Sequence, residues 1–181
     1  MAAIDLFMGI VCLGVVGGHG LHSNSSINNK LHTYSYEKER NSTKVIEIAR
    51  KEIGVRETAY NSSPRISEYL ICVGFKKAAP WCAAFCSWCF REAGLAQPRT
   101  AWSPALFPPG RTVKAARSGL ILGIYFPSMG RIGHVGLVER VQGSLVFSIE
   151  GNTNVAGSRE GDAVLQKARH YRSIARYADW L

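Results

Sequence analysis

Residues 79–94 read APWCAAFCSWCFREAG, and this stretch carries the strongest local signal in the chain. The run is apolar almost throughout, which predicts a buried helix, and Gly94 is suited to end it. Pro80 is suited to a first helical turn, where its missing N–H leaves no hydrogen bond unmade. Cys82 is thereby placed at the N-terminus of the predicted helix, where free backbone N–H groups and the positive end of the helix dipole favour a thiolate.

The other cysteines of this stretch, Cys86 and Cys89, are expected to be packing residues one and two turns further along the helix, because free cysteine is commonly buried. A zinc site built with Cys72 and Cys82 is one alternative, but zinc cysteines usually come as short pairs on turns. A redox pair at Cys86 and Cys89 is another, although it would miss the helix N-terminus where such pairs gain reactivity. We therefore expect no metal and no cofactor.

Charge and cysteine count narrow the class of protein. The chain has 181 residues, which suits one domain with its own core. It holds 22 Lys and Arg against 13 Asp and Glu, a net charge of +9, which favours an anionic partner such as a cell-wall polymer, a membrane surface or a nucleic acid. The basic residues are spread along the chain without a Lys/Arg run, so we expect no nucleic-acid partner. Five cysteines, an odd number, indicate no disulfide framework.

The N-terminal part is expected to lie outside the folded domain. Residues 1–20 form an apolar leader of signal-peptide length, too short for a stable membrane span. Asp5 and the lack of Lys or Arg before the apolar run are untypical of a signal peptide, so a cleaved signal and a retained leader both stay open. Residues 21–42 are rich in Ser, Asn, Lys and Glu, which predicts a polar linker with too little apolar surface to order itself.

Two amphipathic helices are predicted ahead of the cysteine helix. Apolar residues recur at helical spacing in the first, which Gly54 ends, and Ser63 with Pro64 supplies a cap and a first-turn residue for the second. The apolar stripes consist of Val45, Ile48, Ala49 and Ile53 in the first helix and of Ile66, Tyr69 and Leu70 in the second. The folded domain is therefore predicted to cover residues 43–181.

The second half of the chain changes character. Residues 97–110 hold four prolines and form a predicted loop, in which Trp102 and Phe107 either fix the loop to the core or line a cleft. A short helical piece is expected at 113–116. Predicted strands cover 120–126, 135–141 and 145–149, the last two joined by a tight turn at 142–144, with one or two more strands within 163–180. Helices followed by an antiparallel sheet of five to six strands predict an α+β fold.

A base and an orienting group for Cys82 are found on the predicted hairpin. His134 lies between two glycines in GRIGHVGLVERV, and Glu150 and Asn152 lie in SIEGNTN at the end of the next strand. The hairpin would bring His134 and Glu150 to one end, where the carboxylate can orient the imidazole toward a thiolate and Asn152 can assist the histidine or an oxyanion. The plainer alternatives are an ordinary hydrogen-bonded histidine and polar turn residues.

The order PWCAAF, GHVGLVE and IEGNTN resembles the CHAP family of cysteine, histidine-dependent amidohydrolases/peptidases, within the papain-like NlpC-type group of bacterial cell-wall hydrolases. The resemblance extends over roughly residues 45–180. It implies N-terminal helices packed on an antiparallel sheet, with the cleft between them. It also implies that Cys82 is the nucleophile, His134 the general base and acid, Glu150 the orienting residue and Asn152 an accessory polar group.

The function implied by this resemblance is peptidoglycan hydrolysis through an acyl-enzyme on Cys82, by an N-acetylmuramoyl-L-alanine amidase or a stem-peptide or cross-bridge endopeptidase. Trp81 is a candidate substrate-binding wall of the cleft, with core packing as its alternative. The implied setting is secreted, periplasmic or cell-wall associated and bacteriolytic, with a delivery system, an immunity protein or an inhibitor as further partners. Alternatives are a cysteine peptidase or acyltransferase on another substrate, and a non-catalytic wall-binding module.

Overall fold

The structure, a computed structural model, describes residues 22–156 and 161–181. The chain divides into two compact units, Met1–Ser35 and Tyr36–Leu181, and the second contains every strand and two complete helices. The predicted leader lies outside the described residues. No helix in the described part is both long enough and apolar enough to cross a membrane.

Helix α1 (His22–Lys51) runs through the segment predicted to be a linker. No glycine or proline interrupts the sequence from His22 to Lys51, so nothing in the backbone stops the helix from extending toward the N-terminus. Within the second unit, Val45 and Ala49 are fully buried as predicted, whereas Ile53 lies beyond the end of α1 and is 42% exposed. The apolar stripe therefore ends one turn earlier than its spacing predicts.

Helix α2 (Pro64–Ile71) confirms the predicted cap and stripe. The Ser63 hydroxyl accepts a hydrogen bond from the Ile66 N–H at 3.3 Å, and Pro64 occupies the first turn. The buried residues are Ile66, Tyr69 and Leu70. Local chemistry thus determines both where this helix begins and which face it buries.

Helix α3 (Cys82–Glu92) begins at Cys82, as predicted, and its residues from Cys82 to Phe90 are all buried. Trp81 is the N-cap residue and Pro80 precedes it, so the proline lies outside the helix and not in its first turn. Gly94 adopts φ +85°, a left-handed conformation that favours glycine, and it ends the helix. The Leu95 N–H then donates to the Phe90 carbonyl at 3.0 Å.

All strand pairs in the sheet are antiparallel, and the strand order is β1-β6-β2-β3-β4-β5. The predicted helical piece at 113–116 is wrong, because Val113 pairs with Tyr177 in a strand. The predicted tight turn is confirmed by the pairing of Gln142 with Leu145. The strands are β1 (Thr112–Val113), β2 (Ile121–Phe126), β3 (Arg131–Gln142), β4 (Leu145–Thr153), β5 (Ala163–His170) and β6 (Arg176–Ala178). The fold is α+β, as the sequence predicts.

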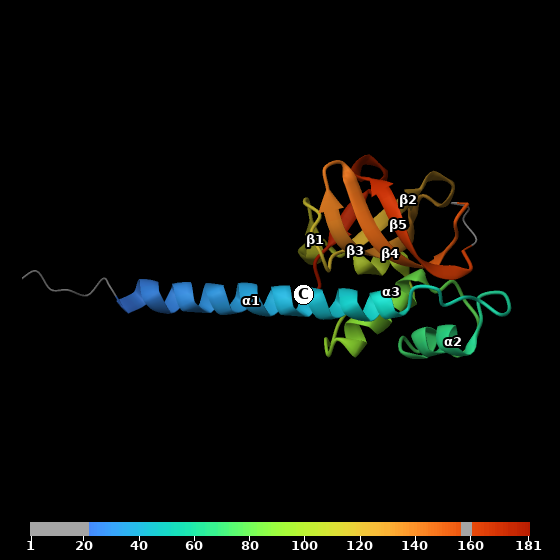
Figure 1. Cartoon of the computed structure of the whole chain (residues 1–181), viewed down its shortest axis with the longest axis horizontal. Helices are drawn as coiled ribbons and strands as arrows, with labels where there is room; N and C mark the ends of the chain where they lie inside the picture. Colours follow the sequence, from blue (N-terminus) through green and yellow to red (C-terminus); the bar gives the residue numbers. More distant parts are fainter. Residues whose placement is uncertain (1–21, 157–160) are drawn as a thin grey trace, which may run out of the picture. The chain divides into compact units, whose positions relative to one another are not determined.

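Helix α3 packs against the central strands β3 and β4 (Figure 1). Gly151 of β4 lies close against this helix, because an added Cβ would lie 2.7 Å from the Trp81 ring and 2.8 Å from Phe85. Any larger residue there would push the strand away from the helix. The fold therefore brings the start of α3 directly against the strands that carry His134 and Glu150.

Candidate active site

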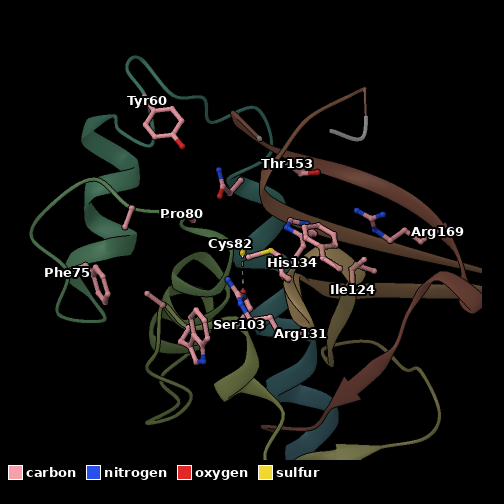
Figure 2. A pocket seen from close by; sticks show the side chains of 17 residues that line it. Tyr60, Phe75, Pro80, Cys82, Ser103, Ile124, Arg131, His134, Thr153 and Arg169 are labelled. Atoms are coloured by element: carbon pink, nitrogen blue, oxygen red, sulfur yellow. Dashed lines mark hydrogen bonds between the residues drawn. The ribbon is translucent and has the colours of Figure 1, made fainter. Parts of the chain in front are cut away.

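Cys82 lies at the edge of a cavity of about 330 Å³. Its side chain is 5% exposed, and its Sγ lies 3.5 Å from the hydroxyl oxygen of Ser103, which is the first residue of the 3-10 helix η1 (Ser103–Leu106). Figure 2 shows Cys82 and His134 pointing toward one another from opposite sides, one from α3 and the other from β3. The first-turn N–H groups of α3, including that of Cys82, lack intrahelical partners.

His134 contacts Glu150 across neighbouring strands. Its Nε2 lies 2.8 Å from the Glu150 Oε2, which leaves Nδ1 as the ring nitrogen available to the Cys82 thiol. Gly136 makes room for this carboxylate, because a Cβ at that position would lie 2.5 Å from the Glu150 Cγ. The sequence prediction that His134 and Glu150 meet is therefore matched by their geometry, with Glu150 in an orienting position.

The Glu150 carboxylate is fully buried and saturated with donors. Arg169 of β5 donates from Nε to Oε1 at 2.5 Å and from Nη2 to Oε2 at 2.6 Å, and the Ser148 hydroxyl donates to Oε1 at 2.6 Å. Burial raises the pKa of Glu150, but the hydrogen bonds and charges of Arg169 and His134 outweigh it and hold this pKa well below its ordinary range. Glu150 is thus ionised and fixed in place.

The pKa values of Cys82 and His134 are shifted in opposite directions. Burial opposes ionisation of Cys82, yet the hydrogen bond and charge of His134, with smaller contributions from Ser103 and the Val135 N–H, lower the pKa of the thiol. Burial likewise opposes the imidazolium, but hydrogen bonds to Cys82 and Glu150 raise the pKa of His134 to about 9. Both shifts favour a thiolate–imidazolium pair over a neutral thiol and imidazole.

Cys86 and Cys89 are fully buried, as predicted for packing residues. Burial is the largest cause that raises the pKa of both thiols well above their ordinary value. Cys72, Cys82, Cys86 and Cys89 are all free thiols. Within residues 22–156 and 161–181, no group of three His, Cys, Asp or Glu residues is arranged to hold a metal ion, so the zinc alternative has no geometric support.

These pKa shifts predict selective alkylation. At pH 7 iodoacetamide should modify Cys82 about tenfold faster than any other described cysteine, since an ordinary thiol is only a few per cent ionised there. Peptide mapping by mass spectrometry of briefly labelled protein measures these rates. Because its pKa is lowered, the rate at Cys82 should rise less steeply between pH 7 and pH 8.5 than the rate at an ordinary thiol. Faster labelling of the half-buried Cys72, or an ordinary thiol titration curve at Cys82, would contradict the assignment.

Asn152 is in the cleft but does not face His134. Its Oδ1 accepts from the Trp81 N–H at 3.3 Å and its Nδ2 donates to the Gly161 carbonyl at 2.7 Å, so the amide spans from the start of α3 to the following loop. Residues two apart on a regular strand share a face, but the register shifts after Glu150 and Asn152 has φ +55°. Among the described residues no hydrogen bond joins Asn152 to the histidine, so this one of its two expected roles has no support. The amide instead supports the start of α3, and the other expected role, at an oxyanion, stays a prediction.

Trp81 is a core residue and not a wall of the cleft. Its side chain is fully buried, its Nε1 donates to Glu57 Oε1 at 2.9 Å, and its ring lies 5.8 Å from the Tyr69 ring. Of the two aromatic residues in the proline-rich loop, Trp102 lines the cavity and is 52% exposed, whereas Phe107 is 5% exposed and belongs to the core. The two aromatic residues of the proline-rich loop thus divide the two roles that the sequence left open.

Three residues of the site were missed from the sequence: Ser103, Arg169 and Glu57. Ser103 follows Trp102 in the proline-rich loop, and nothing local separates it from other serines. Arg169 lies among alternating basic residues of a strand, which does not single it out. The sequence indicates it only indirectly, because a buried orienting carboxylate requires a compensating cation nearby. Glu57 accepts from Trp81 and from Asn152, at 2.9 and 3.4 Å.

Part of the chain matches a known protein family. The CHAP domain family matches residues 74–152. Two solved structures of Ly7917 resemble the chain, one described as containing the hydrolyzing product of MDP (16% identity, TM-score 0.45) and one of Ly7917 alone (18% identity, TM-score 0.44). Each alignment covers 75% of this chain, and 61% and 60% of those chains respectively, so this chain spans about three fifths of their length. No curated protein is significantly similar in sequence.

The matched segment begins at Gly74, ahead of α3, and ends at Asn152, near the end of β4. It contains Cys82, His134 and Glu150 and excludes Arg169. The match to the CHAP family therefore spans the segment that holds the three facing side chains.

Proposed function

We propose that this chain is a peptidoglycan hydrolase that cleaves an amide bond by a thiol mechanism. The observation that carries the proposal is the Cys82–His134 pair, opposed in pKa, at the start of α3 and open to a cavity within a CHAP domain. A nucleophile, a base and an oriented third group in this order are what thiol acyl transfer requires.

The reaction follows from the atoms that face each other. The Cys82 Sγ attacks the carbonyl carbon of the amide, and the negative charge that forms on the oxygen lies near the first-turn N–H of Cys82. The His134 Nδ1 proton passes to the leaving nitrogen as the carbon–nitrogen bond breaks, which leaves a thioester. His134 then takes a proton from water, whose oxygen attacks the thioester and releases the acid product.

Glu150 serves this cycle as a carboxylate that stays ionised throughout. It accepts from His134 Nε2, which fixes the ring so that Nδ1 remains toward Cys82. Arg169 and Ser148 hold the carboxylate from the other side, so the imidazole keeps one orientation through both halves of the reaction. The alternating protonation of one nitrogen of His134 links acylation to deacylation.

The bond cleaved is identified by digestion of purified sacculi. We expect the wild-type protein to release soluble fragments with new termini, which mass spectrometry assigns to the N-acetylmuramoyl-L-alanine amide or to a bond within the stem peptide or cross-bridge. Binding to sacculi without any new terminus would overturn hydrolysis in favour of a wall-binding module. Failure to bind or digest sacculi, together with cleavage of other peptides, would favour a cysteine peptidase on a different substrate.

The proposed substrate lies outside the cytoplasm, so we propose a secreted, periplasmic or cell-wall-associated site of action. The net charge of +9 is consistent with attraction to anionic wall polymers. A delivery system, an immunity protein or an inhibitor remains part of this proposal, since an enzyme of this kind has to be kept from the wall of the cell that makes it. Fractionation of cells that express the chain, followed by immunoblotting, tests the location directly.

A further inference from the structure

We propose that Arg131 forms a carboxylate-binding subsite beside Cys82, so that the substrate carries an ionised carboxylate near the bond to be cleaved. This inference rests on the proposed function, since it assigns a chemical class to part of the same substrate. Both Arg131 and Cys82 line the cavity, and neither the sequence motifs nor the family match assigns a role to the arginine.

Arg131 is held firmly at the wall of the cavity. It is the first residue of β3 and pairs with Phe126 of β2, so its backbone is fixed by the sheet. Its guanidinium carbon lies 4.1 Å from the centre of the Trp102 ring, and its Nη1 donates to the Ile132 carbonyl at 3.0 Å. A guanidinium fixed by stacking and by one hydrogen bond is already oriented before a ligand arrives.

The charge of Arg131 is uncompensated. Among the described residues no Asp or Glu lines the cavity, and no described carboxylate pairs with Arg131. The other arginine of the lining, Arg169, is neutralised by its two hydrogen bonds to Glu150. The cavity therefore offers one net positive group to a ligand.

The donors of Arg131 match a carboxylate in geometry as well as in charge. A guanidinium has five N–H donors, and only one of those on Arg131 has a hydrogen-bond partner among the described residues. The remaining fork suits the two oxygens of a carboxylate. Peptidoglycan stem peptides carry such groups at D-glutamate and at the C-terminal residue.

The position of Arg131 gives the subsite a direction. In Figure 2 Arg131 and Ser103 lie on one side of Cys82, and Tyr60 and Thr153 lie on the other. A peptide bound across the cavity with its scissile bond at Cys82 would therefore contact Arg131 only with the part that lies on one side of that bond. The carboxylate is expected on that side of the cleaved bond.

Binding measurements on the full chain test this subsite without turnover. The protein carries Cys82→Ala, and the ligands are N-acetylmuramoyl-L-alanyl-γ-D-glutamyl-L-lysine and two derivatives, amidated at the D-glutamate α-carboxyl or at the C-terminus. Isothermal titration calorimetry should show one amide binding about tenfold more weakly than the free acid, since a hydrogen-bonded charge pair is lost. Adding Arg131→Gln should remove that difference, whereas Arg131→Lys should retain part of it.

Arg140→Gln is the matched control, because Arg140 also lies on β3 and stacks on an aromatic ring, Phe147, but does not line the cavity. It should leave the preference for the acid intact. The inference is overturned if no ligand binds, if acid and amides bind equally in protein that retains Arg131, or if the preference survives Arg131→Gln. Wild-type turnover of the same ligands is scored separately. A preference that depends on Arg131, with no cleavage of these ligands or of purified sacculi, would sink the hydrolase proposal and leave the subsite standing.

Discussion

Replacing Cys82 by serine is expected to abolish the release of new termini from purified peptidoglycan, with a loss on the order of 10³-fold or more. A serine hydroxyl stays protonated near neutral pH and cannot form the ion pair that His134 makes with a thiolate. His134→Ala should be comparably severe, because it removes both the counter-charge and the proton donor. Since these groups act as one unit, the double variant should lose little beyond either single variant.

Cys72→Ser is the matched control for Cys82→Ser. Cys72 is a free, half-buried thiol that does not line the cavity, so its replacement should leave digestion within a factor of about two. Thermal unfolding of each variant shows whether the fold persists. Activity retained by a folded Cys82→Ser protein would remove Cys82 from the role of nucleophile.

Arg169→Met is expected to reduce the free energy of unfolding by about 3 kcal/mol at neutral pH. Glu150 would remain fully buried without its bidentate cation, and burial would then dominate its pKa. For a domain of this size the loss corresponds to a melting temperature lower by roughly 10 °C. Differential scanning calorimetry measures both quantities.

The cost of Arg169→Met should depend on pH in a defined direction. Arg169 and His134 lower the pKa of Glu150 in the folded protein, so this carboxylate adds stability above its ordinary pKa of about 4.3, and that stability is lost as pH falls. In the variant the carboxyl takes up a proton at higher pH, which removes the uncompensated charge. The difference in stability from wild type should therefore narrow between pH 7 and pH 4.

Arg172→Met serves as the control for that change. Arg172 is an exposed neighbour of the same strand end, and its guanidinium hydrogen-bonds to Tyr171, with no other side-chain hydrogen bond in the described part of the chain. Its replacement should change the free energy of unfolding by no more than about 0.5 kcal/mol at either pH. Equal effects of the two substitutions, or a difference that widens toward pH 4, would contradict the account given for Arg169.

Local patterns were sufficient where the chemistry is local. The cap at Ser63, the buried helix that starts at Cys82 and the turn at Gly143 each depend on a few neighbouring residues, and each was predicted. The helical conformation of the segment expected to be a linker was not predicted, because its polar composition indicates only that it lacks apolar surface. A polar segment continues an adjoining helix when it contains no glycine or proline to interrupt it. A judgement based on polar composition alone does not take this into account.

The site was predictable as far as strand pairing could be inferred. His134 and Glu150 meet because one tight turn joins their strands. Asn152 does not contact His134 as one of its two expected roles required, because a register shift turns it toward the Trp81 N–H. A shift of this kind leaves no clear mark in sequence. Trp81 lies beside the nucleophile in sequence, yet its ring is buried among residues from other elements, which spacing alone does not reveal.

Because α3 precedes the sheet strands along the chain, the reactivity of Cys82 depends on completed folding. The thiol depends on His134 for its lowered pKa, and His134 in turn depends on Glu150 and Arg169 from later strands. A growing or unfolded chain therefore carries an ordinary thiol at this position, which is mostly protonated at neutral pH and inert toward amides. The Cys82 thiol becomes a reactive nucleophile only when the last strands join the sheet. A cell therefore synthesises this chain without exposure to an active nucleophile before folding is complete.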